Sequence, residues 1–265
     1  MLLYFQILGL RIPSYATVAV IGGLLSLCMA LHAGRKYCIR QTDILCASGY
    51  GLLGMLIGAK LFYVIPFIPE LISDVFRHGV SHVKIQEIFA GYVFYGGLLG
   101  IMCGIYCYTR WMKMPFLLFG DILALITPLF HGIGRIGCFL AGCCYGIEYH
   151  GMFAVRFPEN PYEPGIELVE RFPVQLLESG CNFALFIFLY RYYRKGNHGA
   201  GVILGLYLMI YPAIRFLTEV LRGDEVRGVW QIGSLEVSFS QIISLILLPA
   251  GIYLYCNAKK NNSKS

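Results

Sequence analysis

The sequence predicts an all-α, polytopic membrane protein with about seven transmembrane helices, and three observations lead to this fold class. Of the 265 residues, 57% are hydrophobic and 14% are charged, whereas soluble domains carry a charged fraction of about 25%. Apolar stretches long enough to cross a bilayer recur along the whole chain. Glycine is abundant, with 31 residues, which allows helices to pack closely in a membrane. We therefore expect one membrane domain over residues 1–265 and no soluble domain.

Seven apolar segments are the predicted spans, because each is close to the length of about 20 residues that a helix needs to cross the hydrocarbon core. In chain order they cover residues 14–33, 45–66, 91–109, 115–134, 173–190, 200–220 and 237–256. The first 13 residues are too short and too weakly charged for a signal peptide, so we expect them at the membrane interface. In the third span, Gly96, Gly100 and Gly104 lie four residues apart, so they share the face that a neighbouring helix can approach.

The distribution of Lys and Arg predicts an outside amino terminus and a cytoplasmic carboxyl terminus. With that orientation, the segments inside hold eleven basic residues against the single acid Asp43, and the segments outside hold seven basic residues against eleven acids. Such an excess of Lys and Arg is typical of the cytoplasmic side of a membrane protein. The net charge of +6 is thus a topology signal, and we do not infer nucleic-acid binding from it.

Six charged residues fall within or beside the spans, three of each sign, which suggests pairing inside the helix bundle. They are Lys60, Arg135, Arg215, Asp121, Glu178 and Glu219. For Asp121 and Glu178 we favour a structural role, in which the carboxylates neutralise neighbours and fix the helix register. Arg215 and Glu219 lie four apart on one helical face, with Arg222 three residues further along it. Two arginines flanking one carboxylate leave positive charge for an external anion.

The stretch from His131 to Gly146 places Arg135 among closely spaced glycines at the end of an apolar run. An arginine stays protonated in a protein, so near lipid it needs an anionic partner. Glycines beside it leave backbone accessible to a phosphate or polar headgroup, although close helix packing is an alternative role. Because Arg135 and Arg215 both fall at outward ends of even-numbered spans, the residues predict an outward-facing site for an anionic lipid.

These segments resemble the prolipoprotein diacylglyceryl transferase family, a bacterial family with seven spans and an outside amino terminus. Its arginine motif, Gly-Arg-x-Gly-Asn-Phe-x-Asn-Gly-Glu-x-x-Gly, is similar to residues 134–146 here. Six further segments resemble family motifs in the family's order: 12–15, 57–63, 94–100, 172–178, 215–219 and 238–244. The resemblance covers about residues 12–250.

The resemblance implies a multi-pass enzyme of the bacterial cell (inner) membrane that needs no cofactor and no metal. It moves a diacylglyceryl group from phosphatidylglycerol to the lipobox cysteine thiol in the signal-peptide region of a preprolipoprotein, and glycerol phosphate leaves. Its other partners are membrane lipids.

The resemblance also implies roles for particular residues. Arg135 and Arg215 would bind phosphate, and Glu219 would orient Arg215. Tyr95 would contact the headgroup or relay a proton, and Tyr15 would line the lipid site. Two groups of residues would complete the substrate-binding surface: the loop glycines Gly96 and Gly97, and the motif residues Gly134, Gly137, Cys138, Cys143 and Gly146, together with Arg222. Tyr95 and Cys143 are candidates for the base that deprotonates the acceptor thiol.

The arginine motif departs from the family pattern at three positions. Cys138 and Cys143 stand where the family has asparagine and glutamate, and Ala141 replaces a second asparagine. Cys138, Cys143 and Cys144 form a C-x4-C-C cluster. Three interpretations of this cluster are open: a metal site with His131 or His150 as a further ligand, a disulfide, or small residues packed beside Arg135. Two alternative functions follow, a non-catalytic phospholipid-binding paralog and a membrane thiol or metal protein that uses the three cysteines.

Overall fold

The computed structural model describes residues 3–7, 10–65, 68, 94–157, 169–196, 198–223, 229–232 and 235–262. The chain forms two compact units. One combines Met1–Ala33 with Gly120–Ser265, and the other is Gly34–Phe119. We call them the large unit and the small unit.

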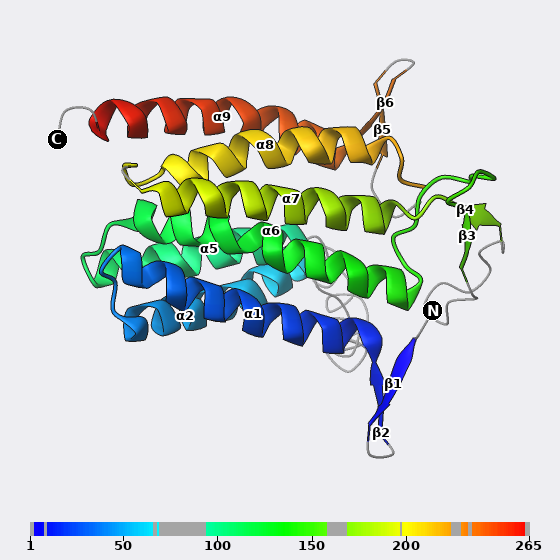
Figure 1. Cartoon of the computed structure of the whole chain (residues 1–265), viewed down its shortest axis with the longest axis horizontal. Helices are drawn as coiled ribbons and strands as arrows, with labels where there is room; N and C mark the ends of the chain where they lie inside the picture. The colour runs from blue at the N-terminus through cyan, green and yellow to red at the C-terminus, as the bar shows by residue number, and fades with distance from the viewer. Residues whose placement is uncertain are drawn as a thin grey trace. The chain divides into compact units, whose positions relative to one another are not determined.

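Seven helices in the described part of the chain correspond one by one to the seven predicted spans (Figure 1). They are α1 (Ser14–Lys36), α2 (Gln41–Val64), α5 (Phe94–Trp111), α6 (Phe116–Ala141), α7 (Val174–Lys195), α8 (Val202–Glu219) and α9 (Phe239–Asn262). Five of them, α1, α2, α6, α8 and α9, are long and apolar enough to cross a membrane. The all-α membrane class is therefore confirmed.

Three short antiparallel hairpins accompany the helices. The first pairs β1 (Tyr4–Ile7) with β2 (Leu10–Pro13) and leads directly into α1. The others pair β3 (Val155–Arg156) with β4 (Glu170–Arg171), between α6 and α7, and β5 (Val229–Ile232) with β6 (Leu235–Ser238), between α8 and α9.

The small unit is built on a glycine interface between α2 and α5. A Cβ added to Gly100 would lie 2.6 Å from the carbonyl carbon of Gly54, and one added to Gly104 would lie 2.8 Å from that of Tyr50. A Cβ on Gly96 would lie 2.9 Å from the carbonyl carbon of Gly58. Real side chains do not tolerate such distances to backbone, so only glycine permits this helix spacing. The predicted packing face of the third span is confirmed.

In the large unit, α7, α8 and α9 run side by side (Figure 1). Helix α6 joins α7 through a hydrogen bond from Ser179 Oγ to the Gly132 carbonyl, 2.8 Å long. Helix α1 joins α7 through Tyr193, whose hydroxyl donates to the Ala33 carbonyl at 2.9 Å. Because consecutive helices alternate in direction, the carboxyl ends of α6 and α8 meet the amino ends of α7 and α9.

Helix α6 differs from the predicted span in a way that matters for the site. The expected boundary was residue 134, whereas the helix continues to Ala141 and includes Arg135 and Cys138. An apolar window ends at an arginine, but a helix continues through one if the charge has a partner within the bundle. The next section identifies that partner.

Candidate active site

The polar centre of the large unit lies where four helix ends meet. Arg135 occupies the last two turns of α6, and Glu178 the second turn of α7. Arg215 and Glu219 lie one turn apart at the end of α8, and Ser240 lies at the start of α9. We call these five residues the arginine cluster.

Glu178 is the centre of the arginine cluster, because its carboxylate pairs with both arginines. Its Oε2 lies 2.5 Å from Arg135 Nε, and its Oε1 accepts a hydrogen bond from Arg215 Nη1 at 2.7 Å. The Glu178 side chain is 4% exposed, so its charge is almost fully removed from solvent. A buried carboxylate of this kind needs charge-assisted partners, and it finds two.

Both terminal nitrogens of Arg215, Nη1 and Nη2, have partners. Nη1 donates to Glu178, and Nη2 pairs with Glu219 four residues along the helix and donates to Ser240 Oγ at 3.2 Å. The predicted pair of Arg215 and Glu219 is confirmed. The two carboxylates and the hydroxyl use both terminal nitrogens, however, so Arg215 differs from the free phosphate clamp that we expected from the sequence.

Only one of the three guanidinium nitrogens of Arg135 has a partner among the residues that the structure describes. Its Nε meets Glu178, while Nη1 and Nη2 have no hydrogen-bond or ion-pair partner among the residues that the structure describes. The side chain is 11% exposed. A guanidinium has five N–H donors in a planar fork that matches a carboxylate or phosphate. Arg135 therefore offers an outer edge with two amino groups to an anion, within a site that fixes its inner edge.

Arg222 belongs to the same end of the large unit but not to the face of α8. The helix ends at Glu219, and Arg222 lies in a turn whose backbone N–H donates to the Glu219 carbonyl at 3.2 Å. The prediction that Arg222 extends the helical face is therefore wrong. Residues 145–147 and 221–223 pair as a short antiparallel bridge, which fixes the loop after α6 to the end of α8.

The charges of this region do not cancel. Arg135, Arg215 and Arg222 carry three positive charges, while Glu178 and Glu219 carry two negative ones. Among the described residues of this region the sum is one positive charge, and one of the two acids is Glu178, for which the sequence predicts a structural role. The positive sum favours an anion at the site.

Gly137 and Gly146 of the arginine motif pack against neighbouring residues, and Gly134 does not. Gly134 and Gly137 lie inside α6, where backbone N–H groups bond within the helix. A Cβ on Gly137 would touch the Tyr15 ring at 3.3 Å, whereas Gly134 has no neighbour within 4 Å. Gly146 donates its N–H to the Phe172 carbonyl, and a Cβ there would lie 2.5 Å from that oxygen. Gly137 and Gly146 are therefore closely packed, the space beside Gly134 is open, and the substrate-binding role of the three glycines stays a prediction.

Gly142 turns the chain back over the end of α6. Its φ of 71° is left-handed, its N–H donates to Phe139, and the N–H of Cys143 donates to the Cys138 carbonyl at 3.1 Å. This is a Schellman cap. The cap folds Cys143 over Cys138, and Cys144 follows with a φ of 58°. The sulfurs of Cys138, Cys143 and Cys144 consequently lie within 4.8 Å of one another.

The loop thiols Cys143 and Cys144 have opposite acidities. Hydrogen bonds from Cys138 and Cys143, together with the charges of Arg135 and Arg222, lower the pKa of the Cys144 thiol. The neighbouring sulfurs of Cys138 and Cys144 raise the pKa of the Cys143 thiol. The positive charges of Arg135 and Arg222 favour a thiolate in this group, and the role of Cys143 as a base for the acceptor thiol stays a prediction.

Gln175 is a site residue that sequence reasoning missed, and Glu178 is one to which it gave only a structural role. Gln175 is fully buried and donates from Nε2 to the Cys143 carbonyl at 2.9 Å, so it holds the cysteine loop in place. Both residues lie on one face of α7, three positions apart. That spacing of two polar residues within an apolar segment was the available signal, but their partners on α6 and α8 are not visible in the sequence.

Tyr95, Gly96 and Gly97 belong to the small unit. All three lie in α5, which begins at Phe94, so the glycines are part of a helix and not of the predicted loop. Gly97 packs on Met55 of α2, whose Cγ would lie 3.3 Å from an added Cβ. The Tyr95 side chain lies outside the described residues, and its role stays a prediction. Tyr15 in the large unit is 49% exposed beside Gly137, which suits a residue that meets lipid.

Asp121 has the structural role that the sequence suggested. It is 1% exposed, and its two oxygens accept hydrogen bonds from the backbone N–H groups of Gly201 and Leu204, each 2.8 Å long. These groups belong to the first turn of α8, whose N–H groups lack partners within the helix. Asp121 therefore caps α8 from a different helix.

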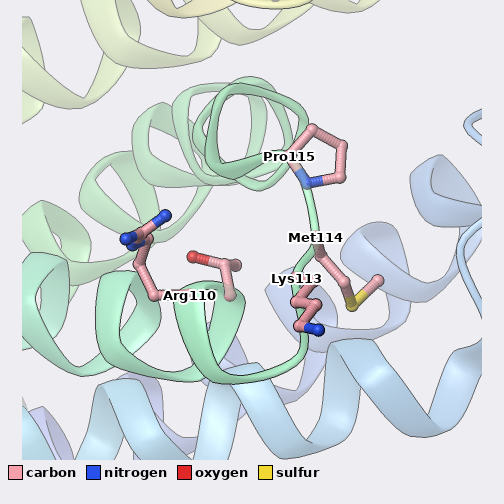
Figure 2. Close-up of a pocket in the computed structure, with 5 residues that line it drawn as sticks. Arg110, Lys113, Met114 and Pro115 are labelled. Atoms are coloured by element: carbon pink, nitrogen blue, oxygen red, sulfur yellow. The ribbon is translucent and has the colours of Figure 1, made fainter.

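One open pocket lies in the small unit, at the connection between α5 and α6 (Figure 2). Its lining residues are Thr109, Arg110, Lys113, Met114 and Pro115. Figure 2 shows Arg110 and Lys113 on opposite sides of the opening. None of the predicted site residues lines it.

Comparison with known proteins agrees with the motifs. The profile of the prolipoprotein diacylglyceryl transferase family matches residues 3–257. The chain is 30% identical over 251 residues to a phosphatidylglycerol–prolipoprotein diacylglyceryl transferase of Clostridium tetani, covering 95% of each chain. It is 32% identical over 251 residues to such a transferase, numbered 2, of Clostridium perfringens, covering 94% of this chain and 92% of that one. A transferase of the same name from Rickettsia akari is 29% identical over 261 residues, covering 96% and 95%.

Proposed function

The chain belongs to the prolipoprotein diacylglyceryl transferase family and is a transferase of the type for which its relatives are named. We propose a reaction in which two substrates meet at the arginine cluster. Phosphatidylglycerol supplies the diacylglyceryl group, and the lipobox cysteine of a preprolipoprotein accepts it. The sulfur forms a bond to the glycerol carbon, the bond from that carbon to the phosphate oxygen breaks, and glycerol phosphate leaves.

The outer edge of Arg135 carries this proposal. It presents two amino groups to the outside of an ion-paired cluster, and a phosphodiester has two oxygens that match this fork. Negative charge grows on the phosphate as the carbon–oxygen bond breaks, so a fixed guanidinium stabilises the transition state more than the ground state. Arg135 is accordingly the catalytic residue, and Glu178 sets its direction.

Arg215, Glu219 and Ser240 act as positioning residues. Arg215 reaches the phosphate only through Glu178, which it shares with Arg135. Arg215 shares the Glu178 carboxylate with Arg135, so that carboxylate does not neutralise Arg135 completely. Tyr15, Arg222 and Tyr95 remain proposed contacts of the headgroup or the acyl chains.

The orientation proposed for the chain puts the arginine cluster on the outer side of the bacterial cell membrane. The last turns of α1, α5, α7 and α9 carry basic residues and no acids of their own: Arg35, Lys36, Arg110, Arg194, Lys195, Lys259 and Lys260. The arginine cluster lies at the opposite ends of α7 and α9. The positive-inside rule then assigns the basic ends to the cytoplasm, and the signal-peptide region of the acceptor meets the site from outside.

A transfer assay tests this function. Purified protein in detergent is given phosphatidylglycerol labelled in its acyl chains and a lipobox peptide, and label on the peptide cysteine is measured. We expect transfer by the wild type and a loss of at least about a hundredfold in Arg135→Ala, the scale of losing a transition-state donor. Arg191→Ala, an exposed arginine of α7, is the matched control and should transfer normally. Undiminished transfer by Arg135→Ala would contradict the assignment.

A further inference from the structure

The three sulfurs of Cys138, Cys143 and Cys144, which we call the thiol triad, form a compact group beside the arginine cluster. They come from one segment of seven residues, and all three cysteines are free thiols. Cys138 is buried, and the other two are partly buried. Free cysteines elsewhere in the described part of the chain lie singly in the helices or at their ends, so this convergence is a local product of the loop after α6.

The backbone around the thiol triad is fixed from both sides. The Schellman cap ties Cys143 to Cys138, and Gln175 donates to the Cys143 carbonyl at 2.9 Å. The following residues, 145–147, pair with 221–223. Cys144 holds a left-handed φ of 58°, a conformation that a non-glycine residue adopts only when its surroundings impose it. The fold therefore maintains the three sulfurs together at the expense of backbone strain.

This geometry suits a thiophilic ion. Zn²⁺ binds thiolates at about 2.3 Å, so tetrahedral sulfurs lie about 3.8 Å apart, within the 4.8 Å that encloses the triad. Three thiolates around Zn²⁺ carry a net charge of −1, and the positive charges of two arginines lie next to them. Both Arg135 and Arg222 lie within electrostatic reach of the Cys144 sulfur, so the charges of the two groups compensate.

The fourth position of such an ion has no ligand among the described residues. His131 packs against Tyr211 with the rings tilted and their centroids 5.6 Å apart, and His150 meets Glu148 and Glu170 instead. Neither histidine joins the triad. Three protein ligands and one open position are the arrangement of catalytic zinc sites, whereas structural sites are closed by four.

The reaction at the arginine cluster needs a thiolate, and the cluster has no carboxylate to produce it. Glu178 and Glu219 are both engaged by arginine. We propose that the thiol triad binds one Zn²⁺ and that its open fourth position takes the lipobox thiol of the acceptor as a thiolate. The first half of this inference stands on the triad itself, and the second half rests on the proposed function.

The resulting step is balanced. On binding the ion, the acceptor sulfur loses its proton to solvent, because a coordinated thiol is deprotonated. Its electron pair forms the bond to the glycerol carbon, and the pair of the broken carbon–oxygen bond stays on the glycerol phosphate beside Arg135. The neutral thioether binds zinc more weakly than a thiolate does, so the product leaves.

Metal content tests the first half. Wild-type protein is purified in detergent with reductant and without chelator, and zinc is measured by mass spectrometry. The cobalt-exchanged protein is examined for thiolate-to-cobalt charge transfer. We expect about one zinc per chain and an intense charge-transfer band. Cys144→Ser and Cys143→Ser should weaken zinc binding by at least about tenfold, and Cys181→Ser, a single thiol of α7, should not. A reduced wild type without zinc or charge transfer overturns the site, as does a disulfide within the triad.

The acceptor's role has a separate test. A lipobox peptide should shift the cobalt spectrum, and the same peptide with serine in place of its cysteine should leave it unchanged. Removing zinc should abolish transfer, restoring it should recover transfer, and phosphatidylglycerol should stay bound throughout. Full transfer by zinc-free protein, or equal spectra with both peptides, overturns this half. If neither form transfers or retains phosphatidylglycerol, the proposed function has failed instead, and the metal content still decides the site.

Discussion

The arginine cluster and the glycine interface between α2 and α5 solve the same problem, helix association in lipid, with opposite chemistry. At the glycine interface, Gly54 and Gly100 bring backbones together without any polar side chain. At the arginine cluster, Glu178 joins α6, α7 and α8 through buried charge. Small residues are sufficient for packing. Buried charge is costly unless paired. Asp43, the buried acid between α2 and α5, meets a tyrosine of α5 and an exposed arginine beside it, whereas Glu178 pairs with two largely buried arginines of two other helices, which marks the arginine cluster as the functional place.

The largest effect on both activity and stability is expected from Glu178→Gln. An amide cannot neutralise two guanidinium groups, so Arg135 and Arg215 would be left uncompensated. Breaking a buried ion pair costs about 3–5 kcal/mol, and we expect a lower melting temperature in detergent together with a loss of transfer of at least about a hundredfold. Glu148→Gln, at an exposed glutamate, should change neither. A stable, active Glu178→Gln protein would remove the distinction between the two regions.

The glycine interface should respond in stability alone. Gly100→Leu places a side chain against the Gly54 backbone, and overpacking of this kind costs about 1–3 kcal/mol or more. Gly49→Leu, on α2 with no neighbour within 4 Å, is the control. We expect a lower melting temperature for Gly100→Leu and a normal specific activity for its folded fraction. Equal melting temperatures for the two variants would contradict the packing role.

Within the arginine cluster, the two arginines should differ. Lysine at position 135 cannot reproduce the outer fork, whereas lysine at position 215 still offers a charge to Glu178 and Glu219. We expect Arg135→Lys to lower kcat/KM by at least about a hundredfold and Arg215→Lys to lower kcat by about tenfold with little change in KM for phosphatidylglycerol. The reverse order in steady-state kinetics would make Arg215 the phosphate ligand.

The smallest effect is expected from the cap of α8. Asp121→Asn keeps one acceptor oxygen of the two that bind the first turn, so we expect a loss of about 0.5–1 kcal/mol and unchanged transfer. The matched change, Asp43→Asn, removes the charge that Arg40 meets at 2.9 Å in the small unit. Loss of transfer by an Asp121→Asn protein of unchanged stability would contradict the structural role of Asp121.

Most of the fold follows from hydropathy, and the order of all seven helices was predicted. The exception is α6, whose last turns hold Arg135 and Cys138. The apolar window that predicts the span ends at Arg135. The helix itself continues because Arg135 pairs with Glu178, which lies 43 residues further along the chain. The sequence also does not show which residues pair with Glu178, because its two partners come from two other helices.

The site was predicted in part, and the division follows the range of the interactions. The pair of Arg215 and Glu219 is four residues apart on one helix, so the sequence reveals it. The thiol triad depends on a turn at Gly142, and the Ala-Gly-Cys-Cys sequence after a helix is consistent with such a cap. A sequence does not distinguish a glycine that admits a ligand from one that packs against a neighbouring residue, and among the glycines of the arginine motif Gly137 and Gly146 have close neighbours whereas Gly134 has none within 4 Å.

Retention of phosphatidylglycerol by Arg135 variants tests the central claim most directly. Wild type, Arg135→Ala and Arg191→Ala are released from identical phosphatidylglycerol-containing detergent micelles, and bound lipid is counted by native mass spectrometry. We predict that the wild type and Arg191→Ala retain phosphatidylglycerol and that folded Arg135→Ala loses it. Equal retention by all three proteins would contradict the assignment of the outer edge of Arg135 to the phosphate.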